Sequence, residues 1–243
     1  MIAANLHHRF TREDAQLAVA LLAQRGRAAA DEAERALRDG GFDAVLDDPA
    51  LPRALLESRI GARASLPLFA YVVARHALLG VGEGDRQLAD FVASLLLHFG
   101  LRGRASRISD VDDQTYDTLA SLLAEVNGPD PRRTLMVRVH LGCHALWLAG
   151  MFPDFIEHRR WRRGGPDIDY YDRLGERGFR LAAEHRLAHE HELDLLFASA
   201  ARRFLVLRVA LNNVSDALLF PRNSTPERLM RQVRDESRWR LSA

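Results

Sequence analysis

Two pairs of histidines have a spacing that could serve chemistry. His140 and His144 lie four residues apart, and so do His185 and His189 further along the chain. In a helix, residues four apart share one face, so the two side chains of each pair would lie together. Helical bundles build metal and haem sites from side chains on neighbouring helices. The spacing therefore predicts one candidate four-nitrogen site, made of His140, His144, His185 and His189.

A structural role accounts for the same histidines. His140 and His144 continue an apolar stripe with Trp147, where a neutral imidazole is held by one or two hydrogen bonds. His189 lies among charged residues and would face water. Neither HExxH nor the inward Glu-x-x-His repeat of di-iron bundles occurs. We interpret the histidines as structural and keep a metal- or haem-dependent enzyme or sensor as the alternative.

A string of aspartates is a second candidate for a metal site. It comprises Asp110, Asp112, Asp113 and Asp117. Carboxylates one helical turn apart can share a hard cation, and aspartate-rich helices of all-α prenyl-transferring enzymes hold magnesium and a diphosphate in this way. Acidic residues are also expected in a first helical turn, because its amides are unpaired and its dipole is positive. A magnesium-dependent prenyl or diphosphate enzyme is therefore a remote alternative.

The densest positive stretch of the chain surrounds a tryptophan. The residues are Arg159, Arg160, Trp161, Arg162 and Arg163. Guanidinium groups and an indole ring could neutralise phosphates and stack on bases, or they could bind an acidic protein. The formal net charge of +1 and the lack of a recognisable nucleic-acid motif weigh against nucleic acid. We therefore predict a partner-binding face at these five residues.

Two residue types are scarce enough to exclude whole classes of chemistry. All 34 basic residues are arginine, so a Schiff-base lysine, a Ser–Lys dyad and a P-loop lysine are excluded. The single cysteine, Cys143, can form neither a disulfide within the chain nor a multi-thiolate metal site. Its neighbour His144 points about 100° away on a helix, so the two cannot act as nucleophile and base. We interpret Cys143 as a small buried hydrophobe.

Apolar residues recur every three or four positions, whereas alternation with period two is absent. We therefore predict an all-α fold: one bundle of about nine helices over residues 1–243, with a lobe boundary near 101–109. The first helix would begin after Thr11, be interrupted at Gly26 and end at Gly40-Gly41.

The segment from Pro131 to Met151 is apolar on almost every side, which predicts a central buried helix. Within it, Gly142 and Gly150 lie eight apart on nearly one face and would let another helix approach closely. Long helices are expected at 167–189 and 192–220, followed by one exposed, arginine-rich helix after Pro221.

The N-terminus lacks the apolar core of a signal peptide, and no apolar stretch approaches the roughly 20 residues that span a bilayer. We therefore expect a cytoplasmic protein that does not bind a membrane.

The stretch LGCHALWLAGMFPD at 141–154, followed by YYDRLG at 170–175 and ALN at 210–212, carries a resemblance. It resembles a group of uncharacterised bacterial all-α proteins whose pattern reads roughly LGDxxLFxxGFFPE and then YYxxMG. The resemblance covers about residues 135–220, and Cys143 stands where the pattern has aspartate. It implies a bacterial helical protein and carries over no activity, cofactor or catalytic residue.

Taken together, these patterns favour a non-catalytic helical binding protein. Its partner would be another protein or a second copy of the chain, and neither a membrane nor nucleic acid is expected. Whether the chain is an enzyme, and which cofactor it would use, stays open at this point.

Overall fold

The computed structural model describes residues 4–100, 105, 107–108, 116, 118–222 and 225–242, except the side chains of Glu227 and residues 236–242. This part of the chain contains thirteen α-helices and no strand, which confirms the predicted all-α fold. The expected number of about nine helices was too low. The chain divides into two compact units, one from Ala3 to Leu97 and one from His98 to Ala243 together with residues 1–2. The predicted boundary near 101–109 lies largely outside the described residues.

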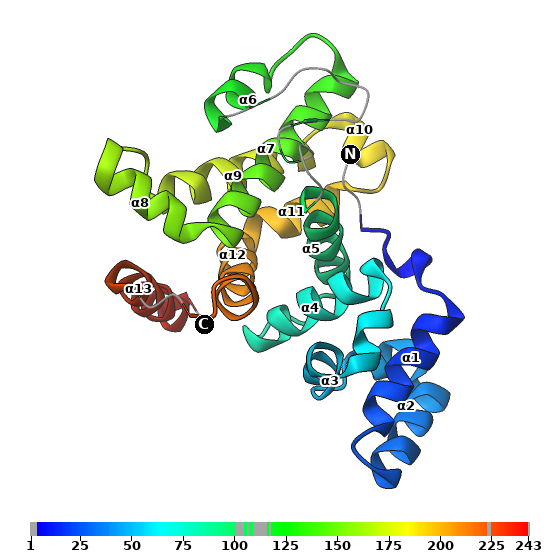
Figure 1. The fold of residues 1–243 in the computed structure, drawn as a ribbon. Helices are drawn as coiled ribbons and strands as arrows, with labels where there is room; N and C mark the ends of the chain where they lie inside the picture. Colours follow the sequence, from blue (N-terminus) through cyan, green and yellow to red (C-terminus); the bar gives the residue numbers. More distant parts are fainter. Residues whose placement is uncertain are drawn as a thin grey trace. The chain divides into compact units, whose positions relative to one another are not determined.

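Five helices make up most of the first unit (Figure 1). They are α1 (Arg12–Ala23), α2 (Arg27–Leu46), α3 (Leu51–Glu57), α4 (Leu66–Gly80) and α5 (Arg86–Phe99), whose last two residues belong to the second unit. Short 3-10 helices, η1 (His7–Arg9) and η2 (Arg59–Arg63), complete it. α1 packs along α2, and it begins as predicted: the Thr11 hydroxyl accepts from the Asp14 amide while the Asp14 carboxylate accepts from the Thr11 amide.

The break at Gly26 and the predicted stop at Gly40-Gly41 are both confirmed. Gly41 has the non-helical angles φ 70° and ψ −169°, so the helical segment that begins at Arg27 ends there, and a second short segment, included in α2, continues to Leu46. Glycine adopts such a positive φ without steric cost. Val45 and Leu46 beyond the kink are fully buried, and their burial stabilises the short segment that follows.

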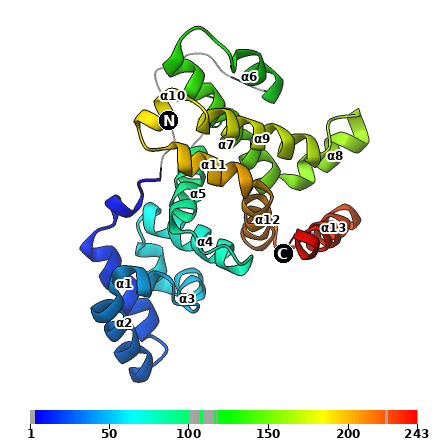
Figure 2. The same cartoon turned by 180° about the vertical axis from the view of Figure 1, so that it is seen from behind.

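The second unit is arranged around α7 (Pro131–Met151), which has buried residues on all of its faces. The other elements are α6 (Leu119–Glu125), α8 (Pro153–Arg163), α9 (Ile168–Ala183), α10 (Arg186–Glu190), α11 (Asp194–Arg202), α12 (Phe204–Val214), the π-helical turn η3 (Ser215–Leu219) and α13 (Pro226–Ser242). α6, α8, α9 and α12 all pack against α7, and α9 lies beside it in both views (Figures 1 and 2). The predicted central helix is therefore confirmed.

Glycines bring α7 close to two different helices. A Cβ atom at Gly142 would lie 2.5 Å from the Phe179 ring of α9, and one at Gly150 would lie 2.7 Å from Leu211 of α12. The predicted close approaches are present, and the two glycines contact different helices, Gly142 against α9 and Gly150 against α12. The two positions share nearly one face of α7, and that face is wide enough to contact both helices.

The two predicted C-terminal helices are each interrupted. The first ends at Ala183, and a new helix begins after His185. The second is broken at Arg203, which lies between α11 and α12 with φ −100° and ψ 12°, and it widens into a π-turn at Ser215. Neither break contains a glycine or proline, so the usual sequence signal for a helix end is absent.

No single helix in the described ranges is long and apolar enough to cross a membrane. By length and composition alone, α7 and α8 would pass as a broken span, with an angle of 87° between them.

Replacing Gly142 by alanine tests the close packing of α7 on α9. The added methyl group would overlap the buried Phe179 ring, so we expect the free energy of unfolding to fall by about 1–3 kcal/mol in chemical denaturation. Gly80→Ala is the control, because a Cβ there meets nothing within 4 Å. It should leave stability unchanged or raise it by a few tenths of a kcal/mol, to about 1. Equal effects of the two changes would contradict the packing argument.

Candidate functional site

Helix α8 carries the predicted partner-binding residues, and proline and glycine fix its ends. Pro153 occupies the first turn, where its missing N–H costs nothing. Gly164 ends the helix in the left-handed conformation, with φ 63°, and its amide donates to the carbonyl of Arg160 at 3.0 Å. The first two turns bury Ile156 and Glu157, whereas everything from His158 to Arg163 is exposed.

All five predicted partner-binding residues are exposed to solvent. Trp161 stands out because 73% of its surface is accessible. The Arg160 guanidinium lies 5.8 Å from the centroid of the Trp161 ring and 3.8 Å from the Glu157 carboxylate. The Arg159 guanidinium lies over the Phe155 ring at 5.6 Å. Positive charge near a helix C-terminus also complements the helix dipole, so part of this arginine content has a structural reason.

One stripe along α8 combines apolar and positive side chains. Phe155, His158, Arg159 and Arg162 occupy positions i, i+3, i+4 and i+7, which share a helix face. Arg160 lies on the opposite side, toward Glu157. The helix therefore places Arg159 and Arg162 on the face of Phe155 and Arg160 on the face of Glu157.

A small apolar pocket lies at the start of this stripe. Its volume is about 280 Å³, and it is lined by Phe152, Pro153, Asp154, Phe155, His158 and Phe220. The Asp154 carboxylate lies 3.6 Å from the Arg231 guanidinium of α13, so its charge is paired. Sequence reasoning missed this pocket, because Phe220 comes from a segment more than sixty residues away.

The end of α7 determines where Phe220 lies. The carbonyls of the last turn of α7 have no helical donor, because the helix ends at Met151 and Phe152 is not helical. The Asn212 amide of α12 donates instead, to the carbonyls of Ala149 at 2.8 Å and Gly150 at 2.7 Å. One turn later, the Ser215 hydroxyl donates to the carbonyl of Met151 at 2.7 Å. These bonds fix η3 against the α7 end and so place Phe220 at the pocket.

A buried charge network holds α13 to the same unit. Arg208 is fully buried and donates to both carboxylate oxygens of Asp235 on α13, at 2.9 and 3.0 Å. It also donates to Asp172 of α9 and to Asn212. Burial raises the pKa of Asp172 to about 6, and the Arg208 charge offsets only part of that effect.

The prediction of an exposed, arginine-rich C-terminal helix is wrong in one respect. The arginines Arg228 and Arg231 of α13 are buried, and both pair with Asp216 at 2.8–2.9 Å. The apolar residues Leu229, Met230 and Val233 are exposed instead. The helix is amphipathic with its charged face inward, because its arginines pair with acidic residues of η3 and α8 and its Asp235 pairs with Arg208 of α12.

The four histidines of the candidate metal site have three different surroundings. The rings of His140 and His144 are buried 5.6 Å apart and contact Phe99. Burial, with a smaller effect of His144, lowers the pKa of His140 to about 3, so its imidazole is neutral. His185 caps α10 by accepting from the Leu187 amide at 3.2 Å, and His189 is an exposed side chain 3.3 Å from Asp194. Within the described part of the chain, no group of three or more His, Cys, Asp or Glu side chains could hold a metal ion.

The remaining sequence candidates add no site to the described residues. Asp110, Asp112, Asp113 and Asp117 lie outside them. Cys143 is fully buried, and burial raises the pKa of its thiol, which fits the predicted role as a small hydrophobe.

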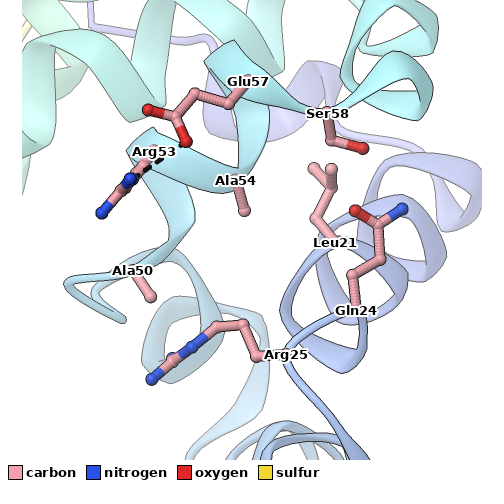
Figure 3. Close-up of a pocket in the computed structure, with 8 residues that line it drawn as sticks. All are labelled: Leu21, Gln24, Arg25, Ala50, Arg53, Ala54, Glu57 and Ser58. Carbon is pink, nitrogen blue, oxygen red and sulfur yellow. Dashed lines mark hydrogen bonds and ion pairs between the residues drawn. The ribbon is translucent and has the colours of Figure 1, made fainter.

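A larger groove in the first unit lies between α1 and α3 (Figure 3). Its volume is about 470 Å³. Leu21 and Gln24 face Ala54 and Ser58 across the groove. Its charged groups are exposed and already paired: Arg53 with Glu57 at 2.9 Å, and Arg25 with Asp48 at 4.0 Å. The groove therefore offers little unpaired charge to recognise a ligand.

The buried position of His140 predicts a pH dependence of stability. In the unfolded chain His140 has the ordinary pKa of 6.5 and is protonated below that pH, whereas in the folded protein it stays neutral until about pH 3. Protonation therefore favours the unfolded chain, and stability falls as pH falls below 6.5. Between about pH 7.5 and about pH 5 the loss should be about 2 kcal/mol. Denaturation of His140→Leu should lack this loss, whereas the exposed His191→Leu should keep it. Parallel pH profiles for wild type and His140→Leu would contradict the assignment.

Arg208→Met tests the buried charge network. The change leaves Asp172 and Asp235 buried without their cation, so we expect the free energy of unfolding to fall by about 3–5 kcal/mol. The exposed Arg177→Met on α9 is the control and should stay within about 0.5 kcal/mol of wild type. A loss below about 1 kcal/mol for Arg208→Met would contradict the role of this arginine.

No protein-family model, curated protein or solved structure matches the chain. The resemblance to bacterial helical proteins stays a prediction, and the function has to be argued from the geometry of α8 and its surroundings.

Proposed function

We propose that the protein is a non-catalytic helical binding protein that recognises an acidic segment of a partner protein through Arg159–Arg163. The observation that carries the proposal is the exposure of all five of these residues at the end of α8, with Trp161 73% accessible. An exposed tryptophan surrounded by arginines is unusual on a surface that binds nothing, because Trp and Arg are the side chains most enriched at the energetic centres of protein interfaces.

Acidic protein is the partner class that the chemistry favours. A guanidinium group presents a planar fork that binds a carboxylate through two parallel hydrogen bonds. The arginines here are concentrated on one helix end, while the whole chain has a formal charge of only +1. A local positive patch on a nearly neutral protein attracts an acidic segment without a general affinity for polyanions.

Reversing the four charges tests the proposal. The variant Arg159→Glu, Arg160→Glu, Arg162→Glu, Arg163→Glu should bind a fluorescein-labelled oligoglutamate peptide at least about fourfold more weakly in low salt, because four exposed pairs contribute about 0.8–4 kcal/mol together. The measurement is fluorescence anisotropy, and helical circular dichroism checks that the variant is folded. Binding by wild type should also weaken as salt is raised.

A second variant provides a control of equal charge. It reverses four exposed arginines elsewhere in the second unit: Arg173, Arg177, Arg180 and Arg202. This variant should retain most of the affinity of wild type. Equal losses in both variants, or tighter binding of single-stranded DNA than of the peptide, would contradict recognition of an acidic protein segment by α8.

A further inference from the structure

We propose that the pocket at the start of α8 is an anchor subsite that takes one apolar side chain of the acidic partner segment, whose carboxylates then bind Arg159 and Arg162. The inference rests on the proposed function and makes it specific. Recognition of an acidic segment by charge alone would not need the pocket, and the inference gives the pocket a role. It also separates the arginines that contact the segment from those that do not.

The pocket has the size and lining for one side chain. Its volume of about 280 Å³ lies below the range of about 300–1,000 Å³ that is typical of sites for whole small molecules. Three phenylalanines and a proline line it. An aromatic or aliphatic anchor in such a pocket is the usual centre of a protein interface.

The pocket and the arginines form one continuous surface. Phe155 and His158 line the pocket, and Arg159 and Arg162 follow on the same face of α8. At 1.5 Å of rise per residue, Arg159 lies about 6 Å and Arg162 about 10 Å beyond Phe155 along the helix axis. An extended peptide advances about 3.3 Å per residue. Its side chains also alternate between two faces, so the carboxylates that face α8 should lie two and four residues from the anchor, about 7 and 13 Å along the peptide, where the long side chains of Arg159 and Arg162 can reach them.

The acidic residues near this surface do not oppose an acidic ligand. Asp154 at the pocket is paired with Arg231, and Glu157 is buried between Arg160 and Arg234, at 3.8 and 3.6 Å. The pairing of Glu157 also occupies Arg160 on the side away from the stripe. Arg159 and Arg162 are thus the arginines that the segment would meet beyond the pocket.

The pocket is formed before any ligand binds. Its walls depend on Pro153 and on the hydrogen bonds of Asn212 and Ser215 to the end of α7, which are all buried. Its apolar side chains are partly open, with Phe155 53% and Phe220 42% exposed. A preformed subsite saves the ordering cost of binding, and truncation of an exposed phenylalanine leaves the fold intact.

The test uses two labelled hexapeptides measured by fluorescence anisotropy with the full chain. One carries a leucine with aspartates at the second and fourth positions after it, and the other carries serine in place of the leucine. Wild type should bind the leucine peptide about 10- to 100-fold more tightly, the range expected for burying one such side chain. Phe220→Ala should reduce this advantage to less than about threefold without changing the affinity for the serine peptide.

Charge variants complete the test. Arg159→Glu, Arg162→Glu should weaken binding of both peptides, whereas Arg173→Glu, Arg177→Glu, an equal change on exposed positions of α9, should weaken neither. Equal affinity of the two peptides for wild type, or a leucine advantage that survives Phe220→Ala, would overturn the anchor subsite and leave acidic recognition standing. If wild type binds neither peptide nor oligoglutamate, the proposed function fails and the subsite with it.

Discussion

The second unit depends on how the carbonyl groups at the end of α7 find hydrogen-bond donors. The last carbonyls of a helix have no helical donor, and Phe152 leaves the helical conformation with φ −131° and ψ 45°, so the buried carbonyl of Ala149 needs a donor from elsewhere. Asn212 provides that donor from α12, more than sixty residues later. The same asparagine accepts from Arg208, which continues the chain of contacts to Asp235 on α13. The end of α7 is thus joined to α12 and, through Arg208, to α13.

The docking of α13 shows how pairing decides which face of a helix is buried. Its apolar residues Leu229 and Met230 would normally turn inward, since burying each is favourable by about 1.5–3 kcal/mol. Arg231 and Asp235 turn inward instead, where Asp235 pairs with the buried Arg208 and Arg231 with the half-buried Asp216. An uncompensated buried charge costs more than an exposed leucine or methionine. The charged face of α13 is therefore buried, and its apolar face is exposed to water.

Sequence reasoning succeeded where the signal was local and failed where partners came from far along the chain. The capping box at Thr11, the all-round apolar character of α7 and the close approach at Gly142 follow from neighbouring residues. The helix breaks at His185 and Arg203 contain no glycine or proline, and the inward charges of α13 pair with Arg208 and Asp216 on other elements. Helical spacing placed each histidine pair on a face, but it could not reveal that His140 faces an aromatic cluster while His189 faces water.

The candidate site also combines features that are local in the sequence with a contact from far along the chain. The sequence shows His158 to Arg163 as a single block of positive charge, and composition alone gives no reason to separate its members. Helical geometry places Arg159 and Arg162 beside Phe155 and turns Arg160 toward the buried Glu157. Phe220 lines the pocket beside Phe155, and the bonds of Asn212 and Ser215 to the end of α7 hold the segment that leads to it. A segment that appears in the sequence as a run of charge is therefore, in the fold, an apolar pocket followed by two arginines, and in our proposal that order distinguishes one acidic segment from another.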